Sequence, residues 1–560
     1  MNDWCVHPAD PQQARQLADR AGVQPLTAQL LLNRGVLNSE DAGQFLRPSL
    51  ESLGDPRELP DVERAVERLR RAIARGESIL IFGDSDVDGI TASVILYEAL
   101  ASLGAAVRAV QSNRISDGYG VPEQLLQALC RPSTHVVILV DCGTNQPAAV
   151  EQLTRAGIDT IIVDHHVPLD GWAQPHALVN PHRVPGGPRH ELCSAGLAFR
   201  VAQALLGPDG DASPYLDLAA LGTLADCSPL RGESRILVAA GLASIVTSRR
   251  RGLARLCEDT HTTDPDPEKI VRQLVPRLNA CGRLGDATAV WHVLRQGTDD
   301  RIDDWVAELD NAHATTKQLH RQVMMEAQEQ VNRLHFRDQY VIVVSRTGWH
   351  QGLMGPLATQ LSQRYGRPAI AIAMDEHKGT GSARSIPALN LLESLKTCES
   401  LLVRFGGHAQ ACGLTVDRKH LDTFRALINE RVRMSLGAEG LVRHRWVDLE
   451  LSSDDLEPAW IGELSQFAPF GHSNPRPTVL LKGVAIELKS PRMATLVDGT
   501  RRMAARGVFP PPVAGQRYDV VASPTLVERE LLLSVSDVKA SAEPSVPVQS
   551  AGRPYTPSRA

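Results

Sequence analysis

Apolar positions recur with two different periods along the chain, and the changes of period mark its parts. Between residues 78 and 163, short apolar runs alternate with segments in which apolar residues recur at helical spacing. The predicted elements, in order, are strand Ser78–Phe82, helix Ile90–Leu103, strand Val107–Gln111, helix Pro122–Leu129, strand His135–Val140, helix Pro147–Ala156 and strand Thr160–Val163. Strands separated by helices of this length predict a parallel, doubly wound sheet, which is an α/β fold.

Further along the chain the pattern changes twice. Helical spacing dominates from about Ser194, and the long polar stretch 300–334 predicts a connecting helix. A second α/β pattern follows, with strand Tyr340–Val344, helix Met354–Tyr365 and strand Ala369–Ala373. Beyond about Gly437, short alternating runs broken by Pro and Gly predict a small β-barrel or sandwich.

These changes divide the 560 residues into consecutive parts. Domains average about 150 residues, so a chain of this length exceeds one domain. The expected parts are an N-terminal helical segment (1–75), a first α/β domain (76–300), a connecting helix (301–335), a smaller α/β domain (336–437), a β-rich domain (438–540) and a tail (541–560). The tail holds Pro, Ser, Ala and Gly without periodicity, which predicts disorder.

Composition argues against a broadly basic surface for nucleic acid. Lys and Arg number 59 against 65 Asp and Glu, for a net charge of -6. A polyanion would therefore meet local basic patches and metal ions. Basic residues do gather in the β-rich part, at Arg443, Arg445, Lys482, Lys489, Arg492, Arg501, Arg502 and Arg506.

Cysteine usage and hydropathy bear on the location of the protein. The chain has 9 cysteines, scattered without a CxxC pair, which is typical of reduced thiols in a cytoplasmic protein. No apolar run reaches the roughly 18 residues that a membrane span needs. The residues after Met1 lack the basic and apolar regions of an export signal. We expect a cytoplasmic protein without a membrane segment.

Three carboxylates occupy the turn after the first predicted strand. Asp84, Asp86 and Asp88 alternate there, and Gly89 permits close backbone approach. A single Asp is enough to cap the following helix, so capping does not explain all of them. Three carboxylates in one tight turn could share two divalent metals.

Other acidic residues and histidines stand at the ends of later segments. Asp141 follows the third predicted strand, Asp226 ends an apolar segment, and Asp164, His165 and His166 follow the fourth strand. The carboxyl ends of parallel strands meet at one edge of a sheet, where open α/β folds build their sites. We interpret His165 as a metal ligand and His166 as a neighbour able to contact phosphate. The pattern predicts a hydrolytic centre that holds two divalent metals.

These residues belong to a longer series of motifs, which runs from about residue 78 to 477. The early motifs are Asp84-Ser85-Asp86-Val87-Asp88-Gly89, Asn113-Arg114-Ile115-Ser116-Asp117-Gly118-Tyr119-Gly120, Asp141-Cys142-Gly143 and Asp164-His165-His166. The later ones are Gly222-Thr223-Leu224-Ala225-Asp226, Pro276-Arg277-Leu278-Asn279-Ala280-Cys281-Gly282-Arg283-Leu284, Trp349-His350-Gln351-Gly352, Gly381-Ser382-Ala383-Arg384-Ser385, Phe405-Gly406-Gly407-His408-Ala409-Gln410 and Pro469-Phe470-Gly471-His472-Ser473-Asn474-Pro475.

The early motifs resemble those of the DHH phosphoesterase superfamily, and the later ones resemble its RecJ branch of bacterial single-strand-specific exonucleases. The family usually has Tyr and Ala where Ser85 and Val87 stand, and Glu where Asp117 stands. Neither Ser85 nor Val87 replaces an expected ligand, so these two departures bear on rate or local packing more than on the chemistry.

The resemblance implies a set of site residues. Two Mn²⁺ or Mg²⁺ ions would be held by Asp84, Asp86, Asp88, Asp141, His165 and Asp226, with His166 beside the scissile phosphate. The smaller α/β domain would be the family's substrate-binding domain, termed DHHA1, and the β-rich part its oligonucleotide-binding (OB) barrel. A 5′-terminal phosphate would be recognised by Arg114, Ser382 and Arg384, and the other implied substrate-binding residues are Arg277, Asn279, Arg283 and His408.

The resemblance also implies an activity. The expected protein is a monomeric 5′ to 3′ exonuclease that hydrolyses single-stranded DNA to mononucleotides in repair and recombination, with a helicase and a single-strand-binding protein as partners. A phosphodiesterase acting on short oligonucleotides or cyclic dinucleotides is an alternative, but the extra barrel and the length argue against it. A non-catalytic single-strand clamp is another alternative, and the presence of all six expected ligands argues against it.

Overall fold

Parallel strands form the first sheet of the chain, in the order β3-β2-β4-β5-β6. The strands are β2 (Ser78–Gly83), β3 (Ala106–Gln111), β4 (Val136–Val140), β5 (Asp159–Val163) and β6 (Ala177–Val179). Every neighbouring pair in this sheet is parallel. Alternate residues of β2 enter two different apolar clusters, Ile79 and Ile81 in one and Leu80 and Phe82 in the other. Both faces of the sheet are therefore covered, which confirms the predicted α/β fold.

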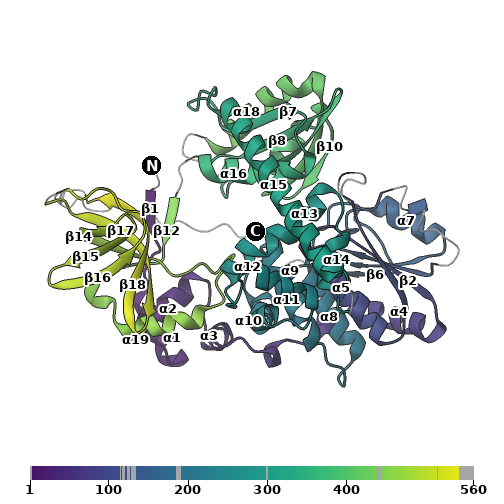
Figure 1. The fold of residues 1–560 in the computed structure, drawn as a ribbon, viewed down its shortest axis with the longest axis horizontal. Helices are drawn as coiled ribbons and strands as arrows, with labels where there is room; N and C mark the ends of the chain where they lie inside the picture. The colour runs from purple at the N-terminus through teal and green to yellow at the C-terminus, as the bar shows by residue number, and fades with distance from the viewer. Residues whose placement is uncertain are drawn as a thin grey trace. The chain divides into compact units, whose positions relative to one another are not determined.

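Helices cover this sheet and extend beyond it (Figure 1). They are α4 (Val62–Arg75), α5 (Val87–Ser102), α7 (Pro147–Arg155), α8 (Ser194–Leu206), α9 (Leu216–Asp226), α10 (Gly232–Val246), α11 (Arg251–Asp259), α12 (Pro267–Gln273), α13 (Val275–Leu284) and α14 (Thr288–Leu294). The long helix α15 (Ile302–Val331) follows, 30 residues in length, where the sequence predicts a connecting helix. Most of the predicted helix Pro122–Leu129 lies outside the described residues.

A second sheet follows α15, in the order β10-β11-β9-β8-β7. Its strands are β7 (Ile342–Thr347), β8 (Ala369–Met374), β9 (Lys378–Arg384), β10 (Leu402–Gly407) and β11 (Ala411–Asp417), with helices α16 (Met354–Tyr365), α17 (Leu391–Lys396) and α18 (Leu421–Leu436). Only the β7–β8 pair of this sheet is parallel. The glycine-rich residues 380–384 lie in β9, and Gly406 and Gly407 end β10.

The C-terminal strands close a barrel. Strands β14 (Val479–Ser490), β15 (Met493–Asp498), β16 (Arg501–Arg506), β18 (Glu530–Ala540) and β17 (Tyr518–Val527) pair in that order, and β17 pairs back with β14. This ring confirms the predicted β-barrel. β13 (Leu449–Leu451) pairs with β14, and β1 (Asp3–Val6) pairs with β12 (His444–Val447), so a strand begins the segment expected to be helical. The remaining helices are α1 (Pro11–Ala21), α2 (Pro25–Asn33), α3 (Ser39–Leu46) and α19 (Pro458–Glu463).

The structure is a computed structural model that describes residues 3–113, 115, 120–122, 126–127, 134–184, 191–297, 300–437, 441, 444–513 and 515–541. The chain divides into two units. The first holds Gly43–Arg443 and Ala468–Pro475 with the two N-terminal residues, and the second holds Asp3–Ala42, His444–Phe467 and Arg476–Ala560. Among the described residues, none of the helices combines the length and apolar character needed to cross a bilayer. The domain boundaries expected from the sequence stay a prediction.

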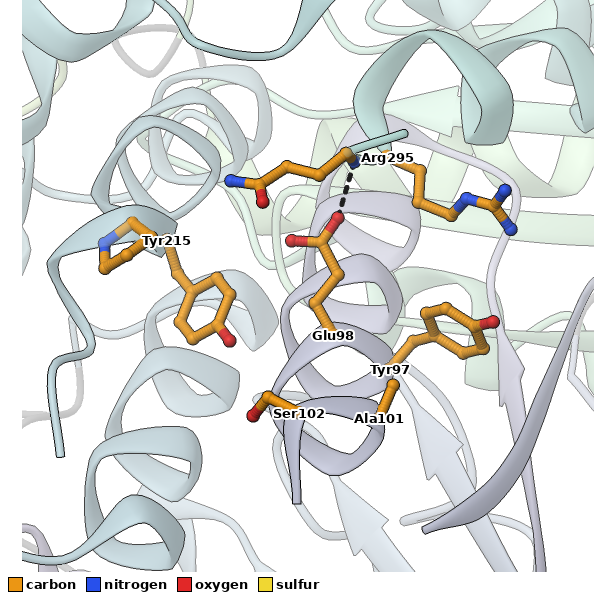
Figure 2. A pocket seen from close by; sticks show the side chains of 8 residues that line it. Tyr97, Glu98, Ala101, Ser102, Tyr215 and Arg295 are labelled. Carbon is orange, nitrogen blue, oxygen red and sulfur yellow. Dashed lines mark hydrogen bonds between the residues drawn. The ribbon is translucent and has the colours of Figure 1, made fainter. Parts of the chain in front are cut away.

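A buried arginine ties four elements of the first unit together. The Arg250 side chain is 0% exposed and forms ion pairs with Glu98 of α5 and Asp217 of α9, at 2.9 Å each. It also donates to the carbonyl oxygens of Leu294 and Pro214. Glu98 lines a hollow of about 470 Å³ and accepts a hydrogen bond from the backbone N–H of residue 296 at 2.6 Å. The dashed line in Figure 2 marks this bond. This carboxylate is therefore already paired, and the hollow lies toward the opposite end of α5 from Asp88.

Replacing Arg250 with methionine is expected to destabilise the first unit by about 3–5 kcal/mol, because the buried Asp217 and the partly buried Glu98 are left as uncompensated charges. Urea unfolding followed by circular dichroism measures the loss. The Arg255→Met variant is the control, since its ion pair with Asp303 is exposed, and its midpoint should match that of the wild type. An unchanged midpoint in Arg250→Met would contradict the structural role.

Candidate metal centre

The turn after β2 holds Asp84 and Asp86 in fixed orientations. Asp84 donates its backbone N–H to Val140 of β4 at 3.2 Å, and its Oδ1 accepts from the Ser112 hydroxyl at 2.8 Å. Asp86 is the N-cap of α5, and its Oδ1 accepts from the Gly89 N–H at 3.1 Å. A Cβ at Gly89 would lie 2.5 Å from the Asp84 carbonyl oxygen. Only glycine therefore allows this tight turn.

Asp88 and Asp141 are held by the start of α8. Both oxygens of Asp88 accept backbone N–H groups, Oδ2 from Ser194 at 2.9 Å and Oδ1 from Ala195 at 2.8 Å. A helix N-terminus favours a carboxylate at this place. Asp141 follows β4 with a left-handed backbone, φ 59°, and its Oδ1 accepts from the Ser194 hydroxyl at 2.9 Å. Ser194 therefore orients two of the predicted ligands, although only its place at the start of a helical run marks it in the sequence.

His165 lies among three carboxylates that come from different elements. Its Nε2 is 3.4 Å from Asp141 Oδ1, 3.8 Å from Asp88 Oδ2 and 3.9 Å from Asp226 Oδ1. Asp226 is the last residue of α9, and its Oδ2 accepts from the Ser228 hydroxyl at 2.6 Å. Residues far apart in the sequence thus converge at the carboxyl edge of the parallel sheet.

The predicted metal ligands form three overlapping groups. In each group the candidate ligand atoms lie within 4.8 Å of one another, and the groups are Asp84 with Asp86 and Asp141, Asp88 with His165 and Asp226, and Asp141 with His165 and His166. All six residues expected to hold metals occur in these groups. Carboxylate oxygens and imidazole are the donors that Mn²⁺ binds, and carboxylates also suit Mg²⁺, so the donor set fits both ions.

Electrostatics at the centre favour bound cations. Burial, followed by the charge of Asp226, raises the pKa of Asp88 to about 6. Burial, followed by the charge of Asp88, raises the pKa of Asp141 well above its usual range. Burial alone would lower the pKa of His165, but its hydrogen bond to Asp141 and the neighbouring carboxylates raise it well above its usual value. Ionised carboxylates buried so close together are costly unless protons or cations balance their charge.

Asp164 orients His166 rather than joining the ligand groups. Its Oδ1 is 2.7 Å from His166 Nδ1, and its Oδ2 accepts from the Thr144 N–H at 3.2 Å. Burial would lower the pKa of His166, but Asp164 raises it to about 9. The His166 ring stacks on the ring of His408, with centroids 5.5 Å apart. Two predicted site residues, one from each α/β domain, therefore meet within the first unit.

Among the other predicted substrate-binding residues, two contact each other on one strand and two contact neighbouring elements of the fold. Ser382 and Arg384 lie side by side on β9, where the Ser382 Oγ accepts from Arg384 Nη1 at 2.9 Å. Arg277 is paired with Asp310 at 3.0 Å, and the Asn279 side chain accepts from the backbone N–H of Val87 at 3.2 Å, so both of these have structural contacts.

Two predicted residues remain. A Cβ added at Gly352 would lie 2.1 Å from the carbonyl oxygen of Arg283. The two sequence motifs that contain these residues therefore pack closely together. Arg114 lies outside the described residues.

Models of known families match three parts of the chain. They are the DHH family N-terminal domain at residues 78–223, the DHHA1 domain at residues 338–434 and the RecJ OB domain at residues 447–494. The matches cover the two α/β regions and part of the barrel.

Curated proteins and solved structures are similar over most of the chain. The single-stranded-DNA-specific exonuclease RecJ of Bacillus subtilis is 34% identical over 86% of this chain, which spans 62% of that relative's length. The protein of the same name from Dickeya dadantii is 33% identical, over 81% of this chain and 82% of its own. The crystal structure of Thermus thermophilus RecJ in complex with Mn²⁺ aligns with a TM-score of 0.82 at 28% identity, over 97% of this chain and 80% of that one.

Proposed function

This chain belongs to the RecJ family. We therefore propose that it is a metal-dependent 5′ to 3′ exonuclease that hydrolyses single-stranded DNA to 5′-mononucleotides in DNA repair and recombination. The observation that carries the proposal is the convergence of five carboxylates and His165 on one edge of the parallel sheet. A phosphodiester hydrolase needs such a concentration of oxygen ligands, because two nearby cations repel each other unless the ligands neutralise them.

The ligands proposed for two Mn²⁺ or Mg²⁺ ions are Asp84, Asp86, Asp88, Asp141, His165 and Asp226. Such ions activate a water molecule and neutralise the charge that develops on the phosphoryl oxygens. The chain's own contribution is to hold the ligands in place: the start of α8 fixes Asp88 and Asp141, and Ser112 fixes Asp84. No covalent intermediate with the enzyme is required.

His166 is proposed to contact the scissile phosphate. The Asp164 carboxylate, 2.7 Å from Nδ1, fixes the plane of the His166 ring. Asp164 is itself 1% exposed and also bonded to Thr144, so the ring cannot turn freely. An imidazole held in this way donates to a phosphoryl oxygen without losing orientational freedom at the moment of reaction.

The smaller α/β domain is proposed to select the 5′ end. Ser382 and Arg384 on β9, with Arg114, would bind a 5′-terminal phosphate, and His408, stacked on His166, would lie between that anchor and the metals. A guanidinium next to a hydroxyl suits a phosphate, since both donate to its oxygens. Arg277, Asn279 and Arg283 are proposed to contact the bound strand as well. Anchoring the terminal phosphate would fix the polarity of digestion.

The Arg384→Ala variant is expected to raise KM for 5′-phosphorylated oligonucleotides by about 10- to 100-fold, because a charge-assisted contact is lost. The KM for 5′-hydroxyl substrates should change much less. Steady-state rates on both substrates measure the difference. Arg433→Ala removes the same charge from α18, where Arg433 pairs with Glu430, and should leave both KM values unchanged. Equal loss on both substrates would argue against a 5′-phosphate anchor.

Location and partners follow from the same proposal. We propose that the protein is monomeric and cytoplasmic, with a helicase that supplies single strands and a single-strand-binding protein as partners. The described cysteines are free thiols, which fits a reducing compartment. The barrel is proposed to bind the strand through its local basic residues, such as Arg492 and Arg506.

Two alternatives make different predictions. A phosphodiesterase for short oligonucleotides or cyclic dinucleotides would need the same metals, but its small substrates would not require the added barrel. A non-catalytic clamp would not need the clustered metal ligands.

Digestion of a single-stranded oligonucleotide, labelled at either end and sampled over time with Mn²⁺, distinguishes the candidates. We expect immediate release of the 5′ label as a mononucleotide while the 3′ label passes through progressively shorter strands. Cleavage of dinucleotides with the long strand intact would favour the small-substrate enzyme. Cleavage of neither would favour the clamp.

A further inference from the structure

One motif of the sequence takes no part in the chemistry proposed for the metals. The segment Ala468–Pro475, which contains Pro469-Phe470-Gly471-His472-Ser473-Asn474-Pro475, lies between residues of the barrel-containing second unit on both sides. The segment itself nevertheless belongs to the first unit, with the metal centre. Its contacts within that unit lie on α10 and on the loop between α9 and α10.

The segment is bonded to the start of α10 and to the loop before it. The backbone N–H of Leu230 donates to the His472 carbonyl oxygen at 2.9 Å. Arg235, which is 2% exposed, donates to the carbonyl oxygens of Pro469 at 3.2 Å and Ala468 at 2.7 Å. A buried guanidinium satisfied by backbone carbonyl oxygens is a strong and specific anchor.

The shape of the segment is set from within. Gly471 and Asn474 exchange backbone hydrogen bonds of 3.0 and 3.1 Å. The Asn474 side chain is 0% exposed and donates to the Pro469 carbonyl oxygen at 2.9 Å. A Cβ at Gly471 would lie 2.7 Å from Leu230 Cδ1, so the segment packs closely against Leu230. Asn474 and Gly471 therefore determine how the segment meets the loop.

That loop carries Asp226, which ends α9 and begins the turn toward Leu230. Within the loop, the Ser228 hydroxyl donates to Asp226 Oδ2 at 2.6 Å, and the Ser228 N–H donates to the Thr223 carbonyl oxygen at 3.2 Å. The Asp226 side chain is 28% exposed, against 3% for Asp88 and 5% for Asp141. Asp226 thus depends on its loop more than the carboxylates fixed by α8 do.

We infer that the segment 468–475 is a positioning element for Asp226: by holding Leu230 it fixes the loop in which Ser228 orients that carboxylate for a metal ion. The inference rests on the proposed function, because it takes Asp226 as a metal ligand. Replacing a residue that orients a metal ligand without binding the metal itself typically lowers metal affinity by about 10- to 100-fold. In this inference, Asn474, Gly471 and the His472 carbonyl oxygen act on Asp226 by way of Leu230.

The test compares Asn474→Ala and Gly471→Ala with the wild type in full-length protein. Direct binding of Mn²⁺, from the paramagnetic resonance signal of the free ion, should weaken about 10-fold at one of two sites. The Mn²⁺ concentration for half-maximal nuclease rate should rise equally, while the rate at saturating Mn²⁺ stays within about 2-fold of the wild type, as expected for a positioning residue.

Matched controls lie in the second unit. Asn33 Nδ2 donates to the Asp448 carbonyl oxygen at 2.9 Å, so Asn33→Ala removes the same kind of bond as Asn474→Ala. Gly462 has open space around its Cβ position, so Gly462→Ala controls for Gly471→Ala. Both controls should bind Mn²⁺ like the wild type.

Three outcomes are distinguishable. Weakened binding at one site in the two test variants alone supports the inference. Unchanged Mn²⁺ affinity in both variants, even with a lower melting temperature, overturns it and leaves the segment a purely structural role. Failure of the wild type itself to bind Mn²⁺ overturns the proposed function, and the inference with it.

Discussion

Replacing Asp141 with asparagine is expected to lower kcat by about 10³-fold or more while the protein stays folded. Asp141 takes part in two of the three ligand groups, so its loss affects both proposed ions. Several kcal/mol of transition-state stabilisation correspond to a rate loss of this size. Asparagine is the suitable replacement because residue 141 has φ 59°, a conformation that asparagine adopts more readily than alanine does.

The same variant is expected to melt at a higher temperature than the wild type when no metal is present. The pKa of Asp141 is raised in the folded state, mainly by burial, so folding favours its protonated form. The stability gained in this way is complete below about pH 4, the pKa of an Asp in the unfolded chain. It is lost as the pH rises through the pKa of Asp141 in the folded state. Asparagine cannot ionise, so its advantage should grow as the pH rises from about 4.

Melting curves of metal-free protein at a series of rising pH values, with kcat measured on single-stranded DNA, test both parts. A stable variant that keeps more than about a tenth of the wild-type kcat would show that Asp141 is not a ligand of the catalytic metals. A variant that melts lower at every pH would show instead that the Asp141 carboxylate, through its bond to Ser194, is needed for the fold.

Removing divalent metal is expected to abolish the nuclease activity and to lower the melting temperature. The clustered carboxylates repel each other without cations, and an ion that binds only the folded state stabilises it by about 2.7 kcal/mol at 100 times its Kd. Dialysis against a chelator, followed by titration with Mn²⁺, should restore rate and melting temperature together. The Asp141→Asn protein should show a much smaller thermal shift with Mn²⁺.

Full activity of a thoroughly chelated protein would contradict a metal-dependent mechanism. A thermal shift with Mn²⁺ that is identical in the wild type and in Asp141→Asn would place the stabilising ion elsewhere. Both measurements need the full-length chain, since the ligands span residues 84 to 226 of the first unit.

Local patterning predicts the first sheet and the ligand positions well. The runs at residues 78–82 and 135–140 become β2 and β4, and helix α16 has the predicted bounds Met354–Tyr365. Once these strands are parallel, their carboxyl ends must lie together, which is why the sequence positions of Asp84 and Asp141 are enough to place both at one site. Their roles as ligands stay a prediction.

Features that depend on distant contacts could not be predicted in this way. Strands β9, β10 and β11 escape prediction because glycines such as Gly381, Gly406 and Gly413 break the apolar alternation, and pairing between neighbours stabilises the strands instead. The place of residues 468–475 in the first unit depends on Arg235, more than 200 residues earlier in the chain. The orientation of His166 by Asp164 depends on side-chain geometry, which the spacing of residues in the sequence does not determine.

Anomalous X-ray diffraction from crystals of the protein soaked in Mn²⁺ tests the proposed metal centre most directly. We expect two anomalous peaks about 4 Å apart, in contact with Asp84, Asp86, Asp88, Asp141, His165 and Asp226, and their loss in Asp141→Asn crystals. Well-diffracting crystals of active protein with no peak at these residues, or with peaks only elsewhere, would contradict a two-metal centre at this edge of the sheet.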